Sequence, residues 1–204
     1  MPAAKLRSHS CISFIDAHRG WALSNIEGKG RVLRASDGGR TWSIISTLKS
    51  GHPGWSFSLP SKIVFTDQVH GWIIETFSAW YTLDGGLNWT EVTPPELKGR
   101  GQLVCEFFLN SLKGWAIGRK VVGHHRAGQS VDVEKLFRGI VLHTTNEGQS
   151  WQPVSVGKDE LFFDRIYFTD VEHGWLLSRD NVYRTTDRGR TWQRVLNVPS
   201  IRGQ

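Results

Sequence analysis

Short runs of apolar and polar residues, most of them four to eight residues long, alternate with glycine-rich turns along this chain. Runs such as KIVF, RVLRA, TWSII and NVYRT are rich in β-branched and aromatic residues. This composition is typical of half-buried strands. No stretch keeps the 3.6-residue period of an amphipathic helix. The pattern therefore predicts an all-β chain.

Two short phrases repeat between these strands. The first reads FxDxxxGW, with Asn for Asp in one copy, and its copies end at Trp21, Trp72, Trp115 and Trp175. The second is close to TxDxGxTW, and its copies end at Trp42, Trp89, Trp151 and Trp192. The copies lie roughly 40 to 60 residues apart, so they define a repeat unit. Each unit has four strands, A to D, in which the first phrase joins A to B and the second joins C to D.

The second phrase predicts a hairpin corner that satisfies its own backbone. Its acid or amide stands at Asp37, Asp84, Asn146 and Asp187. Such a side chain accepts hydrogen bonds from backbone N–H groups just downstream. The glycine two residues later can adopt positive φ without steric cost. The Trp then opens the next strand and buries a large ring whose N–H needs an acceptor. These recurring residues are therefore predicted to be structural.

Four-stranded units of this length indicate the blades of a β-propeller. We expect four four-stranded antiparallel blades at about 11–46, 61–93, 102–155 and 162–197. They form one domain over 11–197, flanked by tails at 1–10 and 198–204. Three arrangements stay open: a closed four-bladed ring, an open arc that forms a homodimer, or part of a longer propeller.

The corner phrase resembles the Asp-box, or BNR repeat, of sialidase-like propellers. The whole unit, FxDxxxGW followed by TxDGGxTW, resembles the photosystem II assembly and stability factor family and its bacterial relatives. The likeness covers about 11–196. It implies a propeller with Asp-box turns between strands C and D, and a subunit of a membrane complex as the partner. Because one propeller scaffold carries many unrelated sites, the likeness says more about fold than about function.

Motifs for enzymatic chemistry are missing from the sequence. It has no phosphate-binding loop and no HExxH, GxSxG or CxxC motif. A sialidase needs three Arg for the substrate carboxylate and a Tyr–Glu pair, and this chain has three Tyr in all. The repeated acids and the turn residues His70 and His173 are better explained as turn formers. We expect no catalytic activity, no metal and no cofactor.

The net charge of +6 favours an acidic partner, such as a membrane surface, nucleic acid or an acidic protein face. The basic residues are scattered and the aromatic residues belong to the repeat, so nucleic acid is not expected. No apolar run is long enough to span a membrane. The start, MPAAKLRSHSCISF, lacks the apolar segment of a signal peptide. We expect a cytoplasmic protein as written, or an exported one if a signal precedes this start.

One departure from the repeat, in the A strands, marks candidate binding residues. Glu106 falls in an otherwise aliphatic column of the A strands, beside a column that contains Lys62 and Arg165, together with Cys11 and Cys105. An isolated buried carboxylate is costly, so Glu106 is paired, protonated or directed into the central channel. The side chains of these two columns either bind an anion or line a water-filled channel. Both cysteines are expected to be reduced and unbonded.

Two loops outside the repeat complete the candidate set. Residues 51–61 carry Trp55 and Phe57, and the insertion at 119–139 carries His124, His125 and Arg126. Aromatic and Arg side chains are frequent interface anchors, whereas the corners repeat and carry no distinguishing information. The alternatives are a lid over a blade edge and an ordinary long hairpin loop. We expect a non-enzymatic scaffold that binds another protein, with a sialidase-like glycan-binding or glycan-cleaving domain as the alternative.

Overall fold

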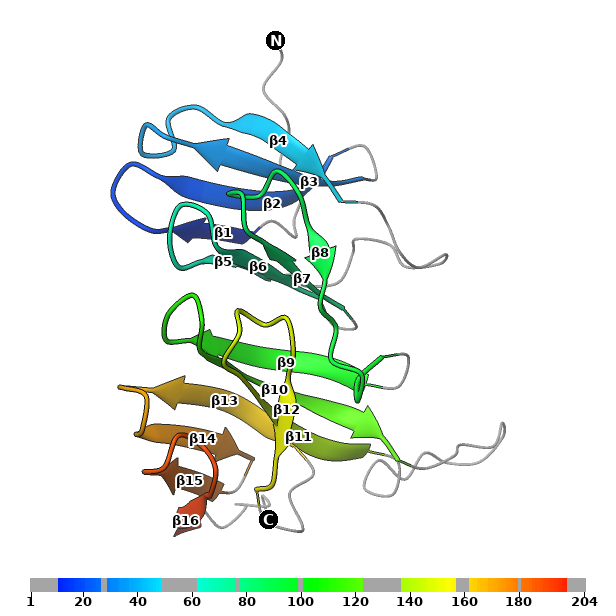
Figure 1. The fold of residues 1–204 in the computed structure, drawn as a ribbon, viewed down its shortest axis with the longest axis vertical. Helices are drawn as coiled ribbons and strands as arrows, with labels where there is room; N and C mark the ends of the chain where they lie inside the picture. The colour runs from blue at the N-terminus through cyan, green and yellow to red at the C-terminus, as the bar shows by residue number, and fades with distance from the viewer. Residues whose placement is uncertain are drawn as a thin grey trace, which may run out of the picture. The chain divides into compact units, whose positions relative to one another are not determined.

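A computed structural model describes residues 11–26, 29–48, 62–75, 78–98, 101–122, 137–156, 162–179 and 181–197. The chain forms two compact units, Met1–Thr93 and Pro94–Gln204. Each unit contains two four-stranded antiparallel sheets, which confirms the predicted all-β class (Figure 1). We call the four sheets blades one to four in chain order.

The first unit contains blades one and two. Blade one consists of β1 (Cys11–Phe14), β2 (Gly20–Ile26), β3 (Lys29–Ala35) and β4 (Ser43–Thr47). Blade two consists of β5 (Lys62–Phe65), β6 (Gly71–Ile74), β7 (Ala79–Thr82) and β8 (Thr90–Glu91). In both blades each strand pairs with the next one along the chain.

The second unit contains blades three and four, with the same strand order. Blade three consists of β9 (Gly101–Phe108), β10 (Gly114–Val121), β11 (Phe137–Thr144) and β12 (Gln152–Val154). Blade four consists of β13 (Phe163–Phe168), β14 (Gly174–Ser178), β15 (Asn181–Thr185) and β16 (Gln193–Asn197). The predicted insertion at 119–139 is wrong at both ends, because Arg119 to Val121 pair with Phe137 to Gly139 in the β10–β11 ladder. The β10–β11 ladder extends the hairpin into both ends of the range where the sequence pattern indicated an insertion.

The glycine before each first-phrase Trp is required by packing. A Cβ atom added to Gly20 would lie 2.6 Å from the ring of Phe14, and one on Gly71 would lie 2.6 Å from the ring of Phe65. The same Phe ring then meets the second-phrase Trp of its own blade edge-on, as in Phe14 and Trp42, whose centroids are 5.9 Å apart. The repeated Phe, Gly and Trp are therefore one packing motif within each blade.

The second-phrase acids accept the predicted backbone hydrogen bonds in their turns. Asp37 Oδ1 accepts from the N–H of Thr41 at 3.0 Å, and Asp187 Oδ1 accepts from the N–H of Thr191 at 2.9 Å. The Trp N–H groups also find acceptors inside the corner, since Trp42 Nε1 donates to the carbonyl of Gly39 at 3.0 Å. The corners therefore hold their shape through bonds within the phrase.

Packing between the two blades of a unit depends on the first-phrase Trp. The Trp21 ring of blade one stacks on the Phe65 ring of blade two, with centroids 3.9 Å apart and planes 8° apart. Trp115 of blade three stacks on Phe168 of blade four in the same way, at 3.6 Å and 15°. These rings are at the centre of the two hydrophobic cores, one in each unit.

Candidate functional site

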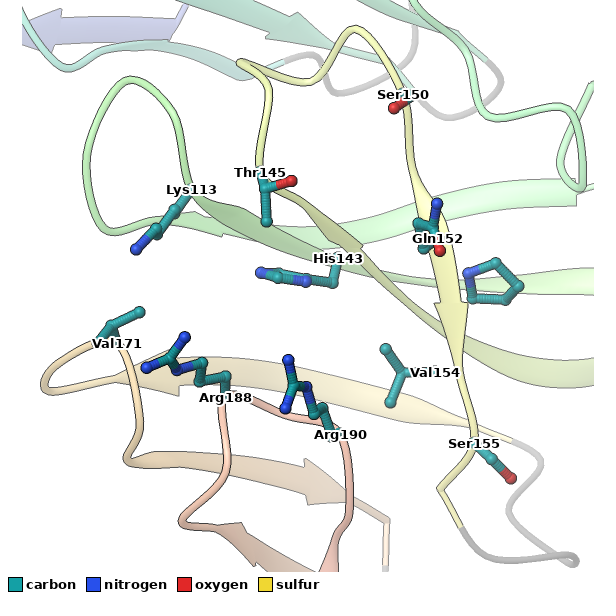
Figure 2. A pocket seen from close by; sticks show the side chains of 11 residues that line it. Lys113, His143, Thr145, Ser150, Gln152, Val154, Ser155, Val171, Arg188 and Arg190 are labelled. Atoms are coloured by element: carbon teal, nitrogen blue, oxygen red, sulfur yellow. The ribbon is translucent and has the colours of Figure 1, made fainter.

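A cavity of about 460 Å³ opens between blades three and four, inside the second unit. Its walls come from the β9–β10 and β13–β14 turns, from β11, β12 and the corner that joins them, and from the corner between β15 and β16 (Figure 2). Three cationic side chains contribute to the walls: Lys113, Arg188 and Arg190. None of the lining residues is an Asp or a Glu. The cavity is therefore a basic pocket.

The repeat itself places these cations. Lys113 precedes the Gly–Trp pair of blade three, and Arg188 and Arg190 flank Gly189 in the second phrase of blade four. Arg188 has a φ of 68°, where the corresponding residues of blades one and two are Gly38 and Gly85. Arg188 also lies 3.4 Å from Glu172 in an ion pair whose two side chains are half exposed. Because such an exposed pair is weak, much of the Arg188 charge stays available to a ligand.

His143 lies in β11 and lines the same cavity as Lys113 and the two arginines (Figure 2). Its ring stacks on Trp115, with centroids 4.8 Å apart and planes 25° apart. Its Nε2 atom is buried and has no hydrogen-bond partner in the described part of the chain. A buried polar atom without a partner is costly, so a bound ligand group that paired with Nε2 would recover that energy.

Burial lowers the pKa of His143, and the charges of Lys113 and Arg190 lower it further. The imidazole is therefore neutral at neutral pH and has one N–H donor to offer. A carboxylate in the pocket would meet three cations and this donor. Hydrogen bonds from a cationic donor to a carboxylate are stronger than hydrogen bonds between two neutral groups. The arrangement is suited to binding an anionic group.

The corresponding position in the first unit has a different chemistry. There Arg34 faces Trp21 across the strand pair, as His143 faces Trp115. Leu87 takes the place of Arg190, and Gly85 takes the place of Arg188. Arg19 takes the place of Lys113, so the first unit keeps that cation and lacks only the two arginines; the basic pocket therefore depends on Arg188 and Arg190 of blade four.

Sequence reasoning missed the residues of this pocket. The repeat columns contain the signal, because the column of Arg190 also holds Arg40, Leu87 and Gln149. That variability indicates a position that the corner itself does not constrain. The spacing of the phrases could not show that Lys113 and Arg190, from different blades, line one cavity.

The predicted candidates lie elsewhere or outside the described residues. Glu106 is buried in β9, with 6% of its surface exposed. Lys62 in β5 and Arg165 in β13 are exposed. A channel site formed by Glu106, Lys62 and Arg165 stays a prediction. Cys11 and Cys105 are both half-buried, and neither is in a disulfide. The five loop candidates lie outside the described residues: Trp55, Phe57, His124, His125 and Arg126.

The recurring acids of both phrases are held as carboxylates by their turns. Hydrogen bonds from the backbone N–H groups of His18 and Arg19 lower the pKa of Asp16 to about 2. Burial raises the pKa of Asp187, but the side-chain and backbone hydrogen bonds of Thr191 outweigh it, so the net direction is downward. The turn histidines pair with acids of their own turns, as His70 Nδ1 does with Asp67 at 2.6 Å.

Two features are absent from the described ranges. No helix there is long and apolar enough to cross a membrane. No group of three or more His, Cys, Asp or Glu side chains in those ranges could hold a metal ion.

The four four-stranded antiparallel sheets define a β-propeller fold, and comparison with solved structures agrees. The structure is similar to an ancestral GH74 enzyme, with a TM-score of 0.60 and 18% identity over 90% of this chain and 23% of that chain. It is also similar to a GH74 enzyme of Niastella koreensis, with a TM-score of 0.53 and 18% identity over 91% of this chain and 24% of that chain. No protein-family model matches the chain.

Two curated relatives have similar sequences. The photosystem II assembly lipoprotein Ycf48 of Picosynechococcus sp. is 31% identical over 75 residues, which are 36% of this chain and 22% of that protein. The vacuolar protein sorting/targeting protein 10 of Mycosarcoma maydis is 39% identical over 62 residues, which are 28% of this chain and 4% of that protein. The matches span less than a quarter of either relative. The chain is thus distantly similar to Ycf48 and to other BNR-type propellers.

Proposed function

We propose that this chain is a non-enzymatic propeller scaffold that binds an acidic segment of another protein. The observation that carries the proposal is the basic pocket between blades three and four, which has three cations and no carboxylate in its walls. The sequence likeness to Ycf48, whose name describes an assembly factor, supports a role in the assembly or stability of a membrane complex.

The alternative is a sialidase-like glycan-binding or glycoside hydrolase domain, which the fold likeness to GH74 enzymes favours. Most glycosidases use two carboxyl groups, one of which is a general acid with a raised pKa. The pocket offers no carboxyl group, and the turn acids Asp16 and Asp187 have lowered pKa values. This chemistry supports binding rather than hydrolysis.

The proposed surface differs from the one expected from the sequence. It includes the corner residues Arg188 and Arg190, whereas the sequence pattern predicts that the corners carry no binding information. The loops with Trp55, Phe57, His124, His125 and Arg126 remain proposed partner contacts, as does the group formed by Lys62, Glu106 and Arg165. The net charge of +6 would speed the encounter with an acidic partner, and salt would weaken that attraction.

The test uses fluorescence anisotropy with a fluorescein-labelled oligoglutamate peptide and an oligolysine peptide as its control. We expect the oligoglutamate alone to bind. Arg190→Gln should weaken binding by about tenfold to a hundredfold, the range for one charged hydrogen bond. Arg40→Gln is the matched control, because Arg40 has the same corner position in blade one.

Equal losses for Arg40→Gln and Arg190→Gln would show that the affinity comes from overall charge and would refute the pocket. A panel of fluorogenic sialosides and xyloglucan oligosaccharides tests the alternative in parallel. Turnover of any of these substrates by the purified chain would overturn the non-enzymatic assignment.

A further inference from the structure

Neighbouring blades within a unit join through one repeated contact. The first-phrase Trp of one blade stacks on the first-phrase Phe of the next, as Trp21 does on Phe65 and Trp115 does on Phe168. The indole N–H then donates to a carbonyl in the next blade's corner. Trp21 Nε1 donates to Gly85 at 2.8 Å, and Trp115 Nε1 donates to Arg188 at 3.4 Å. We call this contact the blade joint.

Blade four exposes the Trp half of such a joint. Leu177, two residues after Trp175, is 42% exposed. The equivalent residues Leu23 in blade one and Ile117 in blade three are 4% and 0% exposed, because the next blade covers them. Trp175 is also only half-buried, whereas Trp21 and Trp115 are fully buried.

Blade one exposes the Phe half of the joint. Ile12 is 65% exposed, whereas the equivalent Ile63 of blade two is 2% exposed. Phe14 is 40% exposed, whereas the equivalent Phe65 is 5% exposed. The two free halves lie on different units and have the residue types that form the joints inside each unit.

We propose that these two faces bind each other between two copies of the chain, head to tail. In this contact Phe14 of one copy stacks on Trp175 of the other, and Ile12 packs beside Leu177. Trp175 Nε1 donates to the carbonyl of Gly38, which corresponds to Gly85 and Arg188 in the internal joints. A second copy of the chain is the partner that fits, because each copy carries both complementary halves of the joint, the Trp half in blade four and the Phe half in blade one.

Two copies offer two such joints. A head-to-tail contact closes into a ring if the rotation per copy allows it and otherwise forms an open array. In both cases the apolar residues Ile12 and Leu177 leave water, which is the main source of affinity in such interfaces. This inference does not depend on the basic pocket or its ligand.

The experiment measures mass by sedimentation velocity over a series of concentrations. We expect the unaltered chain to self-associate. Ile12→Glu and Leu177→Glu each place a charge in the joint and should weaken association by at least about tenfold. Ile44→Glu and Leu112→Glu are the matched controls, because these residues are 49% and 48% exposed and lie outside the joint. Circular dichroism checks that all four variants are folded.

Mixing the two joint variants gives the sharper result. The Ile12→Glu chain keeps an intact Trp175 face, and the Leu177→Glu chain keeps an intact Phe14 face. Each alone should be monomeric, whereas their mixture should form a dimer with a single intact joint. A mixture that stays monomeric overturns the head-to-tail pairing.

Two further outcomes also overturn the proposal. One is an unaltered chain that sediments as a monomer at every concentration. The other is a chain that stays monomeric while Ile12→Glu lowers its melting temperature far more than Ile44→Glu does. That result would show that the two faces meet within one chain rather than between two copies.

Discussion

Ala35→Thr should stabilise blade one by completing its corner. In the other three blades this position is a buried Thr: Thr82, Thr144 and Thr185. Each Thr hydroxyl accepts from a corner glycine N–H at 3.0 Å. Each also donates to the corner acid or amide at 2.8 to 3.0 Å. Ala35 is 2% exposed and has no hydroxyl to offer.

The magnitude follows from these two bonds. A typical intramolecular hydrogen bond contributes ~0.5–1.5 kcal/mol net. Ordering the Thr side chain costs part of this, so we expect a gain of about 1 kcal/mol in the free energy of unfolding. For a chain of this size, that gain raises the melting temperature by about 2–4 °C.

The assay compares Ala35→Thr with Ala35→Val by urea unfolding. Valine has nearly the same shape and a similar strand preference, but it lacks the hydroxyl. The difference between the two variants therefore isolates the hydrogen bonds. A threonine variant no more stable than the valine variant would refute the reasoning that the hydroxyl links the corner.

Three further predictions concern the turns. Asp187→Ala should lower the free energy of unfolding by ~1–3 kcal/mol, because the N–H of Thr191 loses its acceptor; an unchanged melting temperature combined with lost binding would contradict this structural role. Glu147→Gly should raise the free energy of unfolding by about 0.5 kcal/mol, because Glu147 has a φ of 66° and the relief of strain exceeds the entropy cost of glycine; a lower urea midpoint would contradict it. The pKa of Asp16 is lowered from 3.8 to about 2, so its contribution to stability is present above pH 3.8 and is lost as the pH falls toward 2. Asp16→Asn should therefore reduce the fall of the urea midpoint between pH 3.8 and 2. An unchanged slope would show that other groups control acid unfolding.

The sequence alone determined the strands and the corners. Phe14 and Gly20 lie six residues apart, and Asp37 and Thr41 lie four apart, so their contacts form within one hairpin. Such local contacts depend on residue type and spacing, both of which a repeated phrase displays. The comparison of four copies then separated the structural residues from the variable ones.

Only the tertiary structure decided what the variable residues do. The sequence pattern began the insertion too early and ended it too late, because the pairing of Arg119 with Gly139 depends on a partner strand rather than on local composition. It also could not show that the indole N–H of Trp115 reaches the carbonyl of Arg188 in the next blade. Spacing along the chain does not give the distance across a blade boundary. For that reason the basic pocket formed by Lys113 and Arg190 emerges only when the two blades pack together.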